Sequence, residues 1–483
     1  MISIDDLDGA QVLLAGAGVT GVPTAKALLA LGARVTVTDG NAERLGAMAT
    51  DLPAIRTAPG LSTPPEGTVL VVTSPGWKPD NPLLVASAEA GIEVIGDVEL
   101  AWRICQTDDD PPVWLAVTGT NGKTTTIGML ESILRAAGED AVACGNIGLP
   151  VVEAVAAGHR VLAVELSSFQ LHWSPSVRPA VGMLLNIAPD HLDWHGDLDA
   201  YIAAKAQILT GDIALAGTDD ELVAGLLADA PAKAKYGITM SEPAPGQLGI
   251  RDGQLVDRAF ADDAVLIDAS QVRPDSPAGV FDALAAAAVA RAHGVPAEAV
   301  AEGLRRFEPG GHRGVEVGVL DGVRYLDDSK ASNPHAAAAA IRAHERVVWL
   351  AGGLLKGANV DELVAELASH LAGAVLLGRD RDVIAAALAR HAPDVPVHLA
   401  GAGDHDAMAV MVDAVRAASA LAKPGEVVLL APAGASWDMF TDYAHRGRAF
   451  AEAVAMVSAE SRRGRASGRG SVKTPLARPG GRA

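Results

Sequence analysis

The sequence predicts an α/β protein of three domains: an N-terminal Rossmann-like nucleotide-binding domain, a central P-loop ATPase-like domain and a C-terminal Rossmann-like parallel sheet. Three observations support this prediction. The chain has 483 residues, the length of about three domains. Short apolar segments typical of buried strands recur along it, many followed by a turn and a helical pattern. Two of those turns, at residues 16–21 and 119–124, have the glycine spacing of phosphate-binding loops.

Polar segments rich in proline or glycine mark the expected domain limits. Residues 108–112 separate the first domain from the second, and residues 308–314 form a flexible junction before the third. From Glu460 onward the chain is rich in Arg, Gly and Ser without an apolar period, which predicts a disordered tail. The predicted limits are 1–108, 109–310, 311–456 and, for the basic tail, 457–483.

The chain is acidic, with 39 Lys and Arg against 59 Asp and Glu and a formal net charge of −20. This charge argues against nucleic acid or an anionic membrane as a partner. An anionic substrate must then be held by local cations. Cys105 and Cys144 are too few for a disulfide framework, and neither a long apolar run nor a leader-like N-terminus is found. We expect a cytoplasmic, monomeric protein without membrane insertion.

The first glycine-rich turn lies in a β-α-β pattern. Residues 11–15 are an apolar strand, residues 16–21 read G-A-G-V-T-G, and the next strand ends at Asp39. This is the dinucleotide-binding fingerprint, so a nucleotide-dependent oxidoreductase is one interpretation. The other is that the turn binds the diphosphate of a different nucleotide, because a helix N-terminus recognises pyrophosphate charge and not the nicotinamide. A second β-α-β unit follows, with its turn at residues 74–76.

The second glycine-rich turn joins an apolar strand at residues 113–117 to a helix at residues 127–137. Glycines let backbone N–H groups converge on an anion at the positive end of the helix, Lys123 adds a charge, and the Thr124 hydroxyl can hold Mg²⁺. The turn predicts ATP binding, although the full P-loop pattern would have glycine where this chain has Val117. The candidate ATP-binding residues here are Gly119, Thr120, Asn121, Gly122, Lys123, Thr124 and Thr125.

Two more strand ends of the central domain carry polar side chains. Glu165 ends an apolar strand, and because α/β folds place ligands at the carboxyl ends of strands, it is a candidate Mg²⁺ ligand. Asn146 lies in a G-N-I-G turn that either approaches the nucleotide or only connects two elements. Residues 190–195 read D-H-L-D-W-H, a density of acids and histidines that fits a hard cation or phosphate better than zinc. Pro189 and Gly196 predict a loop there.

Lys205 lies in an otherwise apolar helical pattern at residues 201–209. A lysine in such a place usually extends to solvent, which is the expectation from the pattern alone. A second, alanine-rich helix is predicted at residues 276–293, where it would pack under the nucleotide site.

The last third of the chain repeats the strand-then-turn pattern. Lys330, Lys356 and Ser436 follow predicted strands, and Arg313 lies in the glycine-rich junction, where an arginine can reach a phosphate. Because the carboxyl ends of parallel strands meet at one edge of a sheet, these residues predict a site for an anionic small molecule.

As an ordered set, these motifs resemble the Mur ligase family. In the family's order the chain has G-T-N-G-K-T, G-N-I-G, E-L-S-S-F-Q, D-H-L-D, H-R, D-D-S-K-A-S and A-P-A-G-A-S-W-D-x-F. The run E-L-S-S-F-Q-L is most similar to members that add D-glutamate, and the D-N-P-R motif usual in members that add a diamino acid is not found. Folylpolyglutamate synthases resemble the chain in the central turn, but G-x-G-x-x-G and S-P-G in the first domain favour the muramoyl ligases.

The resemblance implies an ATP-dependent ligase of peptidoglycan precursor synthesis that joins D-glutamate to UDP-N-acetylmuramoyl-L-alanine through an acyl phosphate. It implies ATP and two Mg²⁺ ions as cofactors, and a first domain that holds the UDP moiety and not NAD. Another Mur ligase, a folylpolyglutamate synthase-like ligase and an NAD-dependent oxidoreductase are the alternatives.

The resemblance also implies roles for individual residues. The implied catalytic residues are Lys123, His191, Lys205 and Lys330. The implied metal-binding residues are Thr124, Glu165, His191 and a carbamylated Lys205. The implied contacts of the UDP substrate are Val19, Thr20, Asp39, Gly76 and Asn146. ATP would also meet Asp282, Arg313 and Asp328, and D-glutamate would meet Ser332, Lys356, Ser436 and Tyr443.

The chain departs from the family pattern at two places. Well-known members carry Thr-Arg after the acidic residue of strand two, whereas this chain has Gly40 and Asn41, so Arg44 is a candidate substitute for the arginine. Two asparagines are usual on the adenine side, where this chain has Gly279 and Asp282.

Overall fold

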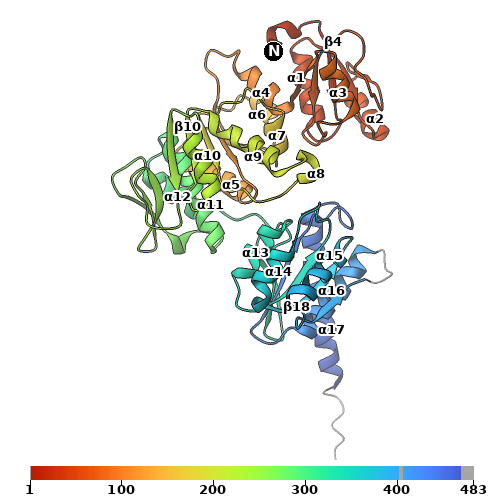
Figure 1. Cartoon of the computed structure of the whole chain (residues 1–483), viewed down its shortest axis with the longest axis vertical. Helices are drawn as coiled ribbons and strands as arrows, with labels where there is room; N and C mark the ends of the chain where they lie inside the picture. Colours follow the sequence, from red (N-terminus) through yellow and green to blue (C-terminus); the bar gives the residue numbers. More distant parts are fainter. Residues whose placement is uncertain (1, 402–405, 469–483) are drawn as a thin grey trace, which may run out of the picture. The chain divides into compact units, whose positions relative to one another are not determined.

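The computed structural model describes residues 2–401 and 406–468, and Figure 1 colours the chain along its sequence. These residues form three β-sheets with helices packed against them, and the chain divides into two compact units, Met1–Pro309 and Gly310–Ala483. The predicted α/β class with three sheets dominated by parallel pairing is confirmed. Both glycine-rich turns lie in the first unit.

The first sheet is parallel, with strand order β3-β2-β1-β4-β5. Its strands are β1 (Gln11–Ala15), β2 (Arg34–Thr38), β3 (Arg56–Thr57), β4 (Thr68–Thr73) and β5 (Glu93–Gly96). Its helices are η1 (Ile4–Leu7), α1 (Gly21–Ala30), α2 (Ala42–Asp51), α3 (Pro82–Glu89) and α4 (Asp97–Cys105). The strand order reverses between β1 and β4, and open α/β sheets bind ligands at such a point, beyond the carboxyl ends of the strands.

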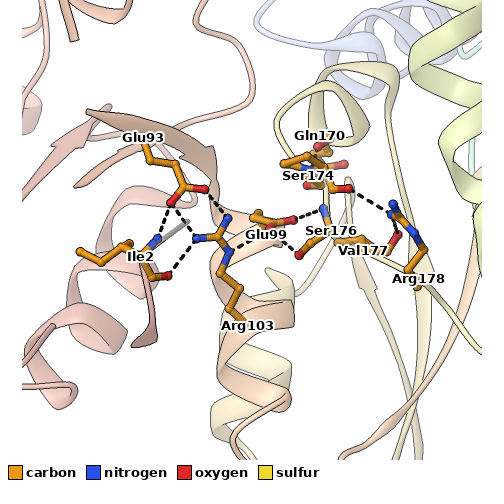
Figure 2. A network of polar contacts seen from close by, with 10 residues as sticks. Ile2, Glu93, Glu99, Arg103, Gln170, Ser174, Ser176, Val177 and Arg178 are labelled. Atoms are coloured by element: carbon orange, nitrogen blue, oxygen red, sulfur yellow. Dashed lines mark hydrogen bonds and ion pairs between the residues drawn. The ribbon is translucent and has the colours of Figure 1, made fainter. Parts of the chain in front are cut away.

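A buried ion network on α4 joins this sheet to the second one (Figure 2). Arg103 donates to Glu99 at 2.8 Å and to Glu93 at 2.7 Å, while Glu99 accepts from the backbone N–H of Ser176 at 3.0 Å. The backbone N–H of Ile2 also donates to Glu93, at 2.8 Å. Glu99 is fully buried and Arg103 nearly so. Each buried charge has hydrogen-bonding partners, which a buried ion pair requires, and the network therefore anchors the two sheets together.

The second sheet has strand order β14-β13-β12-β11-β10-β9-β6-β8-β7, parallel except for the antiparallel pairs of β12 with β13 and β13 with β14. Its strands are β6 (Val113–Thr118), β7 (Ala141–Gly145), β8 (Val161–Glu165), β9 (Val181–Leu184), β10 (Ile213–Gly217), β11 (Ala234–Ile238), β12 (Gln247–Arg251), β13 (Gln254–Asp257) and β14 (Ala264–Asp268). Its helices are α5 (Lys123–Ala136), α6 (Val151–Ala156), α7 (Ser168–His172), α8 (Leu192–His195), α9 (Leu198–Ala206), η2 (Gln207–Thr210), α10 (Glu221–Asp229), η3 (Ala269–Gln271), α11 (Pro277–His293) and α12 (Ala297–Arg306).

The alanine-rich helix predicted at residues 276–293 is present as α11. Residues 283–290 are fully buried, which is the pattern of a helix enclosed on all sides. Alanine side chains let α5 and α12 approach closely, and α5 packs against both α11 and α12. The helix that opens after the second glycine-rich turn therefore rests on a packed core.

The third sheet, in the second unit, has strand order β15-β16-β20-β17-β18-β19. It is parallel except for the hairpin of β15 with β16, so the predicted parallel sheet has an antiparallel edge. Its strands are β15 (Val315–Leu320), β16 (Val323–Asp327), β17 (Val347–Gly352), β18 (Leu371–Leu377), β19 (Val397–Leu399) and β20 (Val427–Ala433). Its helices are α13 (Pro334–Arg342), α14 (Asp361–Leu367), η4 (Ala368–His370), α15 (Arg381–His391), α16 (Ala407–Leu421) and α17 (Tyr443–Gly468).

The sequence predicts that the basic tail begins at residue 457, which lies before the end of the last helix in the structure. The helix α17 continues through residues 457–468, and residues 469–483 lie outside the described chain. Val457 is buried, and Glu460 pairs with Arg416 of α16 at 2.7 Å, so tertiary contacts extend the helix beyond its apolar period. None of the described helices, α17 included, is long and apolar enough to cross a membrane.

Candidate active site

The strand order of the second sheet brings three candidate segments to one edge. The strands β8, β6 and β9 are neighbours and parallel. Glu165 ends β8, the glycine-rich turn follows β6, and Asn186 follows β9. Asn186 accepts a hydrogen bond from the backbone N–H of Asn121 at 3.0 Å, which fixes the turn against the loop after β9. Segments far apart in the sequence therefore form one surface.

The second glycine-rich turn has the geometry of a phosphate loop. Gly122 has φ +87°, a left-handed conformation that favours glycine, and a Cβ there would force the Asp282 carboxylate to move. Lys123 is the first residue of α5, and its Nζ donates to the carbonyls of Gly119 and Thr120, each at 2.9 Å. The turn thus combines a helix N-terminus with a lysine folded over it, which is an anion-binding arrangement. Asp282, a predicted ATP contact, lies beside the turn.

Lys205 also lies at this turn. It is 2% exposed, and its Nζ donates to the Gly119 carbonyl at 2.7 Å and to Thr118 Oγ1 at 3.3 Å. The expectation that it extends to solvent is wrong, because α9 packs with this face toward the turn. Burial first, and the charge of Lys123 second, hold the pKa of Lys205 well below its usual value, while Asp190 and Glu165 act in the opposite direction.

The side chains of Glu165 and Asn146 are hydrogen-bonded to each other. Glu165 is 2% exposed, and Asn146 Nδ2 donates to its Oε1 at 2.8 Å. Gly145 has φ +115°, and a Cβ there would collide with the Glu165 carbonyl, so this glycine permits the close approach of the two strand ends. Asn146 itself is exposed. The G-N-I-G turn therefore orients a carboxylate at the phosphate-loop edge.

His191 has a strained backbone, with φ +55° in a residue that is not glycine. It directly precedes α8, so the loop predicted around it contains a short helix. Its ring contacts Phe169 edge to face at a centroid distance of 4.6 Å, and its Nε2 lies 3.6 Å from Asp190 Oδ2. Strain at such a position is tolerated where the surroundings over-determine it, commonly at functional sites.

The site fits Mg²⁺ better than a metal held by protein side chains alone. Within the described chain, no three His, Cys, Asp or Glu side chains gather as a metal-binding group. Magnesium is usually held by one or two carboxylates, with the remaining positions filled by phosphate oxygens and water. Glu165 at the strand end and Thr124 in the first turn of α5 supply oxygen atoms of that kind.

The first glycine-rich turn is more open. Asp39 accepts from the backbone N–H groups of Ala17 and Asn41, both at 2.8 Å, so its carboxylate is tied to the turn itself. Val19 is 84% exposed at the tip of the turn. The Thr20 and Ser74 hydroxyls lie 3.5 Å apart, which brings this turn beside the turn after β4 that contains Gly76.

The first departure from the family pattern has a structural role here. Asn41 is the N-cap of α2 and accepts from the backbone N–H groups of Glu43 and Arg44. An asparagine is among the best residues for this position. Its place is therefore explained without a ligand, and Arg44 lies in the first turn of the helix that it caps.

The candidate residues of the second unit share one edge of the third sheet. The backbone pairs residues 354 and 435 as a β-bridge, and Ala433 N–H donates to the Ala331 carbonyl at 2.9 Å. These contacts place the turn with Lys356 beside the turn with Ser436, and both near the segment that holds Ser332. The Lys330 ammonium lies 3.9 Å from the Tyr443 ring centroid, a cation–π contact.

Two further predicted ATP contacts, Arg313 and Asp328, lie near each other. Burial raises the pKa of Asp328 to about 7, and the charge of Arg313 opposes that rise. The preceding His312 is held by Asp327, with Nδ1 at 2.6 Å from Oδ2. The junction before the third sheet is therefore fixed to the end of β16.

Two residues that support the sites were missed by the sequence analysis. Arg446 is buried and donates to Ser329 Oγ at 3.0 Å and to the Gly434 carbonyl at 2.9 Å, and burial lowers its pKa to about 10. Tyr201 Oη shares a 2.8 Å hydrogen bond with Thr120 Oγ1 in the phosphate loop. Neither stands in a glycine motif or at a strand end, so the local pattern carried no signal for them.

Comparison with known proteins agrees with this arrangement. Residues 117–252 match the Mur ligase middle domain, and residues 305–434 match the Mur ligase glutamate ligase domain. The chain is 52% identical to the UDP-N-acetylmuramoylalanine--D-glutamate ligase of Rhodococcus jostii, over 94% of this chain and 97% of the relative. It is 51% identical to the protein of the same name from Mycobacterium tuberculosis, over 93% and 96%.

Solved structures with much lower identity share the fold. UDP-N-acetylmuramate-alanine ligase MurC from Thermotoga maritima superposes with a TM-score of 0.55 at 17% identity, covering 92% of this chain and 99% of that one. MurF from Acinetobacter baumannii gives 0.56 at 17% identity, covering 89% of each chain.

Proposed function

This chain belongs to the Mur ligase family, and from that premise we propose that it joins D-glutamate to UDP-N-acetylmuramoyl-L-alanine, with ATP hydrolysed to ADP and phosphate. The reaction contributes to peptidoglycan precursor synthesis in the cytoplasm, where ATP and UDP-linked precursors are available. The supporting observation from the relatives is the 52% identity over nearly the whole chain to a protein named for this reaction.

The single geometric observation that carries the proposal is the pair of lysines on the phosphate turn. Lys123 and Lys205 both donate to the carbonyl of Gly119, at 2.9 and 2.7 Å. A simple nucleotide-binding turn needs one lysine. The second lysine, Lys205, is buried and interacts electrostatically with the carboxylates of Glu165 and Asp190. This arrangement supports a site that transfers a phosphoryl group.

The first chemical step activates a carboxylate, which is a poor electrophile at neutral pH. The alanyl carboxylate oxygen attacks the γ-phosphorus of ATP, the bond to the β-phosphate oxygen breaks, and ADP leaves with its electron pair. Lys123 and the N-terminus of α5 offset the negative charge that develops on the transferred group. Mg²⁺ bound to Glu165 and Thr124, with His191 nearby, would supply further charge neutralisation; two ions are proposed.

The second step forms the amide. The D-glutamate amine attacks the acyl carbon, the bond to the phosphate oxygen breaks, and the amine nitrogen loses a proton. In our proposal Lys330, Lys356, Ser332, Ser436 and Tyr443 hold the D-glutamate, and Arg313 and Asp328 meet ATP. A cationic edge of this kind suits a dicarboxylate in a protein with a net charge of −20.

We propose that Lys205 is carbamylated. Its lowered pKa favours the neutral amine, whose nitrogen can attack the carbon of CO₂ and release a proton, giving a carbamate. The product is a carboxylate beside Thr118 and Gly119, and this charge would suit the second Mg²⁺ ion. It would also replace a buried amine, whose protonated form is disfavoured, by a carboxylate whose charge a metal can compensate.

In the first unit we propose that the UDP moiety contacts Val19, Thr20, Asp39 and Gly76, with Asn146 nearer the reacting end. The functional domains proposed are 1–108, 109–310 and 311–456. The residue assignments follow the family motifs of the first domain, and the exposure of Val19 at the tip of the first turn supports them.

The proposal is tested by phosphate release from ATP in the presence of UDP-N-acetylmuramoyl-L-alanine. Release is expected to require D-glutamate and to be absent with L-glutamate or a diamino acid. Phosphate release with the diamino acid would show instead that the protein is another ligase of the family. A thermal shift with NAD, or an absorbance change of NADH with any of these substrates, would instead favour the oxidoreductase alternative.

A further inference from the structure

A link between the first two sheets joins the turn after β4 to the short helix α8. Lys78 Nζ donates to the Asp193 carbonyl at 2.6 Å and lies 4.0 Å from its carboxylate. Trp194 Nε1 lies 3.4 Å from the Gly76 carbonyl, at the long end of the hydrogen-bond range. Gly76 and Lys78, which follow β4 of the first sheet, thus contact Asp193 and Trp194 of α8.

The helix α8, which Lys78 contacts, begins directly after the strained His191. The Trp194 and His195 backbone N–H groups donate to the His191 carbonyl at 3.0 and 3.1 Å, so α8 is built directly on that residue. A left-handed backbone in a residue with a side chain persists only where its neighbours hold it. The bond from Lys78 fixes the first turn of α8, and so it holds His191 from outside the central domain.

The Trp194 ring fixes the other side of the helix. It is 8% exposed and packs at centroid distances of 4.6 Å from Phe169 and 5.1 Å from His172. This packing places α8 on α7, which follows Glu165 in the chain. Because the Trp194 ring is nearly buried among aromatic side chains, the exposed Lys78 is the element of the link that can be changed without disturbing the core.

The link is local, because the two sheets are already anchored elsewhere. The buried network of Arg103, Glu99 and Ser176 holds them together at α4 (Figure 2). Loss of the Lys78 contact therefore leaves the two sheets joined and acts on α8 alone.

We propose that Lys78 is a positioning residue that couples occupancy of the UDP-substrate turn to the placement of His191. The inference rests on the proposed function, because it takes the turn with Gly76 as a substrate contact and His191 as a residue of the ATP and metal site. A substrate seated on residues 74–76 would order the turn, and Lys78 would transmit that order to α8 through the Asp193 carbonyl.

Hydrogen exchange tests the coupling without metal or turnover. In the unmodified protein, UDP-N-acetylmuramoyl-L-alanine is expected to slow amide exchange in peptides covering residues 190–197 by about threefold or more. In Lys78→Met this slowing is expected to disappear, and Lys78→Arg should restore most of it. Lys26→Met, which alters an exposed lysine of α1, is the matched control and should behave like the unmodified protein. Slowing that persists in Lys78→Met overturns the proposal.

A second measurement separates positioning from direct substrate binding. In Lys78→Met, the Mg²⁺ concentration for half-maximal phosphate release should rise about three- to tenfold, with the melting temperature unchanged, because His191 is less well placed. A rise only in the KM for the UDP substrate would make Lys78 a direct contact and overturn the coupling. If the unmodified protein released no phosphate in response to D-glutamate, the proposed function itself would be wrong. That result differs from both outcomes expected for Lys78→Met.

Discussion

The two glycine-rich turns of the first unit follow the same local plan but differ in their surroundings. Each follows a strand of a parallel sheet and opens a helix. At the first turn Val19 is 84% exposed and Asp39 is tied to the backbone N–H of Ala17. At the second, Lys123 folds back onto the Gly119 carbonyl and the buried Lys205 donates to the same atom. The first turn is exposed at its tip, whereas two lysine side chains cover the second.

A glycine motif therefore specifies the shape of the backbone and not the chemistry of the site. A helix N-terminus attracts an anion in either case. Only the second turn adds two lysine side chains, the charged Lys123 and the buried Lys205, at the place where a transferred phosphoryl group would lie. We therefore expect changes at the second turn to lower turnover and changes at the first to weaken substrate binding.

The largest expected effect is at Lys123. Lys123→Ala should lower kcat by on the order of 10²-fold or more, because a preorganised charge at the transferred group is lost. The measurement is D-glutamate-dependent phosphate release at saturating substrates. Near-normal turnover in this variant would show that the two turns do not differ in the way described. It would also contradict the assignment of the second turn as the ATP site.

Lys205 should follow with a smaller effect. Lys205→Ala is expected to lower turnover about 10- to 100-fold, the range seen when a residue that supports a metal site is lost. If the working group is a carbamate, added formate or acetate should restore part of the activity. Chloride at the same ionic strength is the control. Equal rates with both salts would argue against carbamylation, and an unmodified lysine in a structure with Mg²⁺ bound would count heavily against it.

At the first turn, Asp39→Ala should act on substrate binding. The change removes an acceptor for the Ala17 and Asn41 N–H groups, so the turn loses its fixed shape. We expect the KM for UDP-N-acetylmuramoyl-L-alanine to rise about tenfold and the KM for ATP to stay the same. Steady-state kinetics with each substrate varied in turn would measure this. A matching rise in the KM for ATP would mean that the turns do not act separately.

The smallest effect concerns stability and not catalysis. Asp97, which follows β5, is 3% exposed, and burial raises its pKa to about 7. The folded state thus binds a proton more tightly than the unfolded state, so the stabilisation is present at low pH and is lost as pH rises through about 7. Asp97→Asn should avoid this loss and be more stable than the unmodified protein at pH 8 by on the order of 1–3 kcal/mol.

Urea unfolding at pH 5 and pH 8 would measure the Asp97 effect. The advantage of the asparagine variant is expected to be smaller at pH 5, where the carboxyl group is protonated in the fold. An equal difference at the two pH values would show that packing, and not ionisation, separates the two proteins.

The fold class could be predicted because its signals are local. Apolar strands, glycine turns and helix periods lie within a few residues of one another, as at β6 (Val113–Thr118) and α5 (Lys123–Ala136). The candidate residues at strand ends were identifiable for the same reason: parallel strands bring Glu165 and the phosphate turn to one edge whatever connects them. Their roles in binding and catalysis stay predictions.

The failures depended on contacts distant in sequence. Whether Lys205 reaches solvent depends on the packing of α9 against a turn that precedes it by more than 80 residues, so the apolar pattern alone gave the wrong result. The helix α8 is four residues long and follows a left-handed His191, which no periodicity reveals. The extended part of α17 contacts α16 through Glu460 and Arg416, which lie 44 residues apart in the sequence.

The order of strands, turns and helices, and the family to which the chain is similar, could thus be inferred from the sequence, because they follow from neighbouring residues. Which charges are buried and which turns meet became clear only from the folded chain. It placed the Lys205 amine on the Gly119 carbonyl and the Lys78 ammonium on the Asp193 carbonyl. Desolvation and hydrogen bonding depend on all the atoms that surround a group in space, and the chain supplies those atoms from distant segments.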